Sequence, residues 1–117
     1  MIEQWITEIK RDCNSQELGM ILLHDGIVRA TTKDGRQVRG MNLSYNKPLL
    51  ASTIEKFRRR EGIADVRVWI NEGRLNIGDD IMKVCIAGRF RTDVLPALQE
   101  LLTIIKKEIV HEEEELV

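Results

Sequence analysis

Three basic side chains occupy positions where they could bind an anion or take part in a reaction. Arg29 ends the segment Gly26-Ile27-Val28-Arg29, which closes an apolar stretch that we interpret as a strand. A planar guanidinium in this position can hold an anionic group through two parallel hydrogen bonds. The alternative is an arginine whose stem lies over the sheet while its head reaches water. Both interpretations of Arg29 remain open on the residues alone.

Arg91 stands at an expected junction between a strand and a helix, in the segment from Ala87 to Asp93. The first N–H groups of a helix lack partners within the helix and attract anions, and Arg91 would add a full positive charge. This pattern favours a phosphate or carboxylate site. A salt bridge from Arg91 to Asp93 or Glu100 would explain it equally well.

Lys106 follows the apolar run 101–105 near the end of an expected helix. An ammonium group that loses solvation among apolar side chains can serve as a nucleophile or a general base. Lysines are also common at this place because their charge interacts favourably with the C-terminal end of the helix dipole. Catalysis and simple helix termination are therefore the two hypotheses for Lys106.

The charges are unevenly distributed along the 117 residues. The whole chain has 18 Lys and Arg against 19 Asp and Glu, but residues 26–91 carry 14 basic and 7 acidic side chains. Such a segment suits a phosphate-bearing ligand better than a long polyanion. The hypothesis of a nucleic-acid module using Arg58-Arg59-Arg60, Arg36 and Arg39 has little support in the sequence, because aromatic residues make up only 4% of the chain and no RNA-binding signature is visible.

Cysteine and histidine are too few and too scattered to indicate a metal site or a disulfide framework. Cys13 and Cys85 are 72 positions apart, and the only histidines are His24 and His111. We expect no metal and no cofactor. The first twelve residues contain five charged side chains and no long apolar segment follows, so we expect a cytoplasmic protein without a signal peptide or membrane span.

Apolar periodicity predicts alternating helices and strands. The expected helices cover residues 2–14, 48–61 and 92–107, and the expected strands cover 20–29, 38–43, 66–71 and 81–87. The Asp34-Gly35 turn should join the first two strands as an antiparallel hairpin. Pro48 should begin the second helix and Gly62 end it, while Thr92 or Asp93 should cap the third.

This order of elements predicts one α+β domain over residues 1–117, with helices covering a mainly antiparallel sheet. Residues 73–79 should form a turn between two strands. Residues 111–117 should be an acidic C-terminal tail, and Glu112 to Glu115 should be a frayed, solvated end. A second possibility for these glutamates is that they fold back over the basic surface.

In order and spacing, several short motifs over residues 18–107 are similar to those of one enzyme family. They comprise Gly26, Val28, Arg29 and Gly35, then Gly73, Leu75, Gly78 and Asp79, then Arg91 and the pair Ile105-Lys106. Together they resemble the large, catalytic subunit of molybdopterin synthase, the MoaE-like family, which implies that family's α/β hammerhead fold. The resemblance implies sulfur transfer from the thiocarboxylated Gly-Gly tail of a small ubiquitin-like sulfur-carrier subunit to cyclic pyranopterin monophosphate.

The resemblance also implies roles for individual residues and an oligomer. Arg29 and Arg91 would bind the phosphate of the pterin substrate, and Lys106 would be catalytic. The large subunit would form a homodimer that carries a small subunit at each end. Phe90 stands where the family has a histidine, and the run Glu112 to Glu115 replaces a segment with a second functional lysine. A noncatalytic relative that binds or regulates the ubiquitin-like partner is therefore the alternative hypothesis.

Overall fold

The computed structural model describes residues 1–117 and contains helices, strands and one π-helical turn. The helical elements are α1 (Ile2–Asp12), α2 (Lys47–Arg58), α3 (Arg91–Ile104) and the π turn η1 (Ile105–Ile109). The strands are β1 (Met20–Ile27), β2 (Val38–Tyr45), β3 (Ile63–Ile70), β4 (Gly73–Asn76), β5 (Asp80–Gly88) and β6 (Val110–Leu116). No helix is long and apolar enough to cross a membrane.

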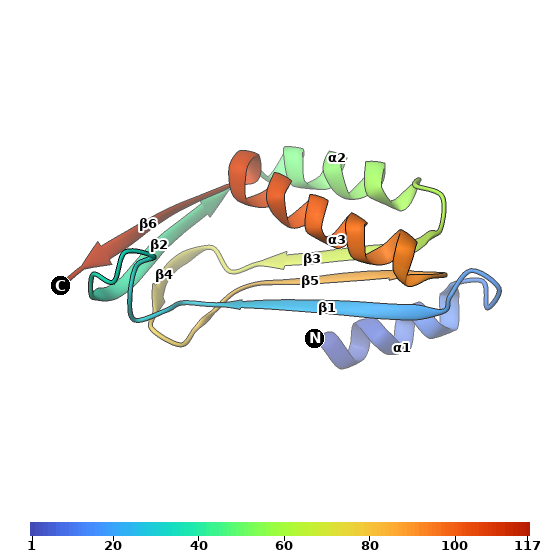
Figure 1. Ribbon diagram of the computed structural model, residues 1–117, viewed down its shortest axis with the longest axis horizontal. Coiled ribbons are helices and arrows are strands. Elements are labelled where there is room, and N and C mark those ends of the chain that lie inside the picture. Colours follow the sequence, from blue (N-terminus) through green and yellow to red (C-terminus); the bar gives the residue numbers. More distant parts are fainter.

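The strands form two antiparallel sheets that lie one after the other along a molecule of 51 × 25 × 23 Å. The first sheet has the order β1-β5-β3 and the second the order β4-β2-β6. Helices α2 and α3 cover one face of the first sheet, and α1 lies on its other face (Figure 1). The α+β class with antiparallel sheets and covering helices is confirmed, although the strands divide into two sheets.

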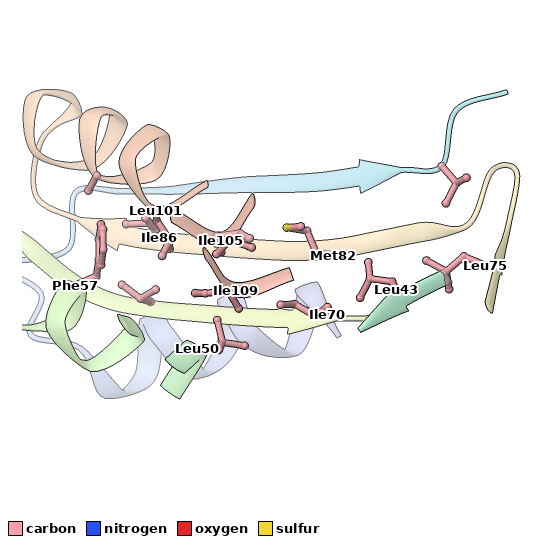
Figure 2. Packing of buried hydrophobic residues seen from close by; sticks show 14 of the residues in the cluster. Leu43, Leu50, Phe57, Ile70, Leu75, Met82, Ile86, Leu101, Ile105 and Ile109 are labelled. Atoms are coloured by element: carbon pink, nitrogen blue, oxygen red, sulfur yellow. The ribbon is translucent and has the colours of Figure 1, made fainter. Parts of the chain in front are cut away.

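One hydrophobic cluster of sixteen buried residues connects the helices with both sheets. It runs from Phe57 and Leu101 beneath the helices, through Ile105 and Ile109, to Leu43 and Leu75 in the second sheet (Figure 2). A smaller cluster on the other face of the first sheet packs Ile9 of α1 against Cys85 and Ala87. The π turn therefore lies at the centre of the packing that joins the two sheets.

The expected hairpin between the first two strands is wrong. Strand β1 pairs with β5, and β2 pairs with β4 and β6 in the other sheet. Only an isolated bridge between Thr31 and Gln37 connects the two segments. The Asp34-Gly35 turn does form, with φ of +88° at Gly35, but it closes a short loop instead of pairing two strands.

The acidic C-terminal segment is a strand and not a frayed end. It forms β6, which pairs along β2 with His111 opposite Ser44 and Glu114 opposite Met41. Residues 73–76 also pair with β2, where we had expected only a turn. The second expectation for the glutamates, that they approach basic groups, is closer to the structure.

The helix ends differ in detail from the expected ones. Pro48 does lie in the first turn of α2, where the Asn46 side chain accepts a hydrogen bond from the Leu49 N–H at 3.0 Å. However, α2 ends at Arg58, four residues before Gly62. Helix α3 begins at Arg91 with Phe90 as its N-cap, and it has no side-chain cap because phenylalanine carries no acceptor. The expected cap candidate Asp93 lies in the first turn, where its carboxylate accepts a hydrogen bond from Arg89.

Cys85 should be unreactive in the folded protein. Its side chain is fully buried in β5, and burial raises the pKa of its thiol to about 11. Since the thiolate is the reactive form, it becomes abundant only above that pH. We expect a thiol reagent at pH 8 to leave Cys85 unmodified in native protein and to label it after denaturation. Labelling of native Cys85 as fast as in the unfolded chain would contradict this packing.

Candidate functional site

A cleft of about 730 Å³ opens at the second sheet, between the connection from β1 to β2 and strand β6. Its lining is rich in charged side chains of both signs. The basic residues are Arg29, Lys33, Arg36 and Lys106, and the acidic residues are Asp34, Glu112 and Glu114. This volume is in the usual range for a small-molecule site. The structure contains no group of three His, Cys, Asp or Glu side chains placed to hold a metal ion.

Arg29 is held at the cleft by the backbone of its neighbour Val28. The N–H of Val28 donates to the Asp79 carbonyl oxygen, and the N–H of Gly78 donates to the Val28 carbonyl oxygen, both at 2.9 Å. Gly78 has a φ of +88°, which glycine adopts without strain. Because the Val28 side chain is buried, the next side chain points outward, and the Arg29 guanidinium donates to Thr31 Oγ1 at 3.1 Å. The Gly78-Asp79 turn thus positions Arg29.

The loop after Arg29 supplies two further cations: Lys33, which sequence analysis did not single out, and Arg36, which it considered only for nucleic-acid binding. The N–H of Thr32 donates to the Arg36 carbonyl oxygen at 2.8 Å, and the Arg36 N–H donates back to Thr32 Oγ1 at 3.0 Å. These bonds close a compact turn that places Lys33 and Arg36 in the cleft lining. The sequence does contain a signal for this cationic loop, because Arg29, Lys33 and Arg36 surround the Asp34-Gly35 turn.

Lys106 enters the cleft from the π turn that follows α3. Ile105 and Ile109 of this turn are buried, and the Val110 N–H donates to the Ile105 carbonyl oxygen across the widened turn. The Lys106 side chain is 67% exposed, so burial does not desolvate its ammonium. Its Nζ lies 3.8 Å from Oε2 of Glu112, whose side chain is only 19% exposed. Lys106 therefore carries a solvated charge with one acidic neighbour.

Arg91 lies outside this cleft, at the first residue of α3, whereas Lys106 follows the other end of that helix in the π turn. The two residues are fifteen positions apart, which corresponds to about 22 Å along a helix. The carboxylates that could have paired with Arg91 have other partners: Asp93 pairs with Arg89 at 2.9 Å and Glu100 with Arg60 at 2.7 Å. The structure brings Arg29 and Lys106 together and leaves the guanidinium of Arg91 exposed and unpaired.

Two of the three arginines in the run from the end of α2, Arg58 and Arg60, are engaged in contacts within the protein. Arg58 pairs with Glu55 at 2.7 Å and with Asp65 at 3.1 Å, and Arg60 lies 4.1 Å from the centre of the Phe57 ring. Internal ion pairs reduce the positive charge that a phosphate backbone would meet. This arrangement disfavours the nucleic-acid hypothesis.

Comparison with known proteins identifies the family. A family model described as MoaE protein matches residues 3–108. An uncharacterized protein of Methanocaldococcus jannaschii is 26% identical over 95 residues, which cover 78% of this chain and 80% of that protein. The solved molybdopterin synthase of Staphylococcus aureus has a TM-score of 0.79 at 19% identity, covering 100% of this chain and 85% of that chain.

A second solved structure contains two different subunits. It is the complex of subunits 1 and 2 of the molybdopterin-converting factor from Helicobacter pylori, with a TM-score of 0.72 at 15% identity, covering 98% of this chain and 78% of that chain. These two structures share the fold of this protein, while the family model covers most of its sequence. The chain therefore belongs to the MoaE protein family.

Proposed function

We propose that this protein is the large subunit of a molybdopterin synthase. It transfers sulfur from the thiocarboxylated C-terminus of a small ubiquitin-like subunit to cyclic pyranopterin monophosphate. The observation that carries this proposal is the meeting of Arg29 and Lys106 in one cleft of suitable size, in a chain that matches the MoaE family model. The two-subunit complex from Helicobacter pylori supports a small protein partner.

The charges of the cleft suit the two anions that must meet in this reaction. Arg29, Lys33 and Arg36 form a cationic loop that can hold the substrate phosphate. Lys106 can attract the thiocarboxylate of the partner and stabilise negative charge that develops during sulfur transfer. Because its ammonium is exposed, Lys106 is accessible to a partner's extended C-terminal tail.

Arg91 requires a second copy of the chain if it is to bind the same substrate. Within one protomer it lies about 22 Å along α3 from Lys106. We propose a homodimer in which Arg91 of one protomer extends the phosphate-binding surface of the other. Its exposed, unpaired guanidinium supports this role.

Sulfur gain by the pterin is the direct test of the proposed function. The purified protein is mixed with thiocarboxylated partner and cyclic pyranopterin monophosphate, and the products are analysed by mass spectrometry. We expect a dithiolene product, and none when the partner ends in an ordinary carboxylate. Partner binding without any sulfur gain would reject the enzymatic function and favour the hypothesis of a noncatalytic relative. The observation that supports this alternative is the presence of acidic groups of β6 in the cleft.

Replacing Arg29 by alanine should weaken substrate binding roughly tenfold to a hundredfold, because a charge-assisted hydrogen-bonding group is lost. The apparent Kd of the phosphate-bearing substrate, measured by calorimetry, checks this. Arg39→Ala is the matched control, since Arg39 is an exposed arginine on β2 that does not line the cleft. Equal weakening by both variants would show that only the overall charge matters.

A further inference from the structure

The cleft has walls of opposite charge. The loop between β1 and β2 supplies Arg29, Lys33 and Arg36, and β6 supplies Glu112 and Glu114. The one acidic residue of the loop, Asp34, already accepts a hydrogen bond from the Thr32 hydroxyl. A ligand that fills this cleft therefore meets cations along one side and carboxylates along the other.

The two glutamates occupy positions where the pattern of the sheet calls for apolar side chains. Glu112 is opposite Leu43 and Glu114 is opposite Met41, and both of these neighbours are buried. The Glu112 side chain is only 19% exposed and loses part of its solvation beside these apolar groups, whereas Glu114 stays exposed to the cleft. The cleft face of β6 therefore presents two carboxylates at alternate positions, Glu112 partly buried and Glu114 exposed.

The two carboxylates differ in their partners. Glu112 is the ion-pair partner of Lys106 at 3.8 Å. Glu114 lines the same cleft but forms no salt bridge or side-chain hydrogen bond in the structure. Glu113, between them, points to the other face of the sheet, where it lies 3.3 Å from His111. The acidic wall thus contains one acceptor group that is free to bind a ligand.

We infer that Glu114 recognises the donor edge of the pterin ring and so determines which substrate the cleft accepts. A pterin carries a 2-amino group beside the N3–H, and these two donors are arranged like one side of a guanidinium. A carboxylate accepts such a pair through two parallel hydrogen bonds. The inference rests on the proposed function, from which the pterin substrate follows. It adds Glu114 as the residue that binds the donor edge of the pterin.

This contact also fixes the direction in which the substrate lies. With the pterin edge on Glu114 of β6, the phosphate extends toward Arg29, Lys33 and Arg36 on the opposite wall. Glu112 keeps the ammonium of Lys106 at the β6 side of the cleft. The reverse orientation would bring the phosphate beside the unpaired carboxylate of Glu114 and leave the donors of the ring facing the loop cations, which disfavours it.

The test compares a pterin with a lumazine, in which a carbonyl oxygen replaces the 2-amino group. Neopterin monophosphate and its lumazine counterpart are titrated into the full-length protein, and binding is followed by ligand fluorescence. We expect the wild-type protein to bind the pterin about tenfold more tightly or better, because the carbonyl oxygen faces a carboxylate. Glu114→Gln should reduce this preference to about twofold or less, because an amide can donate as well as accept.

Glu113→Gln is the matched control, with the same change of charge on the opposite face of the same strand. It should keep the full preference for the pterin. Arg29→Ala should weaken both ligands by the same factor and leave their ratio unchanged. Loss of the preference in Glu113→Gln to the same extent would overturn the inference, because it would show an effect of net charge alone.

The failure of this inference and the failure of the proposed function give different results. Equal affinity of the wild-type protein for pterin and lumazine, together with measurable sulfur transfer, would overturn the role of Glu114 and leave the proposed function standing. Absence of binding for both ligands, together with absence of sulfur transfer, would overturn both. A retained circular dichroism spectrum in Glu114→Gln confirms that any loss of preference comes from the site.

Discussion

Lys106→Ala should lower the rate constant of sulfur transfer about 100-fold or more. Its ammonium is the only basic group that reaches the cleft from the helical side, since the other three cations come from the loop between β1 and β2. A positioned charge at the reacting centre contributes factors of roughly 10² to 10³, and none of the loop cations replaces it. A single-turnover time course, followed by mass spectrometry of the pterin, measures the effect.

The neighbouring lysine gives a sharp control for this prediction. Lys107 is also exposed and belongs to the same π turn, but it does not line the cleft that contains Arg29. Lys107→Ala should therefore change the rate less than about twofold, as is usual for a surface substitution away from a site. An unchanged rate in Lys106→Ala would reject the proposed role, and equal losses in both variants would indicate a general effect on the turn.

Local patterns in the sequence predicted most elements but not their partners. Helical and alternating apolar spacing identified α1, α2, α3 and the strands β1, β2, β3 and β5. The pairing of β1 with β2 was wrong because the Asp34-Gly35 signal reports only on the turn itself. Strand pairing depends on which apolar side chains are buried together, and here Met41 and Leu43 of β2 are buried with Leu75 of β4 in the core. Such contacts between distant residues have no local signal.

Strand β6 was missed because consecutive glutamates have a low preference for strands and usually indicate a solvated end. In the structure, two of these glutamates form ion pairs with basic side chains of other elements. Glu115 pairs with Arg74 of β4, and Glu112 pairs with Lys106. The excess of positive charge in residues 26–91 was a hint that an acidic segment could be attracted to it, but it does not specify the register with β2.

The candidate site was predictable only in part for a similar reason. Arg29 and Lys106 are 77 positions apart, and no local pattern connects them. The family resemblance joined these two residues with Arg91, which the structure places at the far end of α3. A motif records which residues occur together and not whether one protomer or two bring them together.

Ile105→Ala should destabilise the protein by about 2–5 kcal/mol, the usual cost of removing a large aliphatic side chain from a close-packed core. Ile105 is fully buried in the cluster that joins the two sheets, so its truncation would leave a cavity among apolar side chains. Urea denaturation should show a lower midpoint with an unchanged slope. Thr103→Ala, at an exposed position of α3, should cost less than about 0.5 kcal/mol.

The same substitution should also affect the reaction, because Ile105 directly precedes Lys106. With Ile105 and Ile109 both buried, the π turn has one fixed orientation and holds Lys106 on the side of the cleft. A cavity beneath the turn would allow it to shift, so we expect Ile105→Ala to slow sulfur transfer even at urea concentrations where it is fully folded. Ile105→Val, which removes a single methylene group, should cost only about 0.5–1.5 kcal/mol and keep the rate. If Ile105→Ala lost stability but transferred sulfur at the normal rate, the position of Lys106 would not depend on this packing.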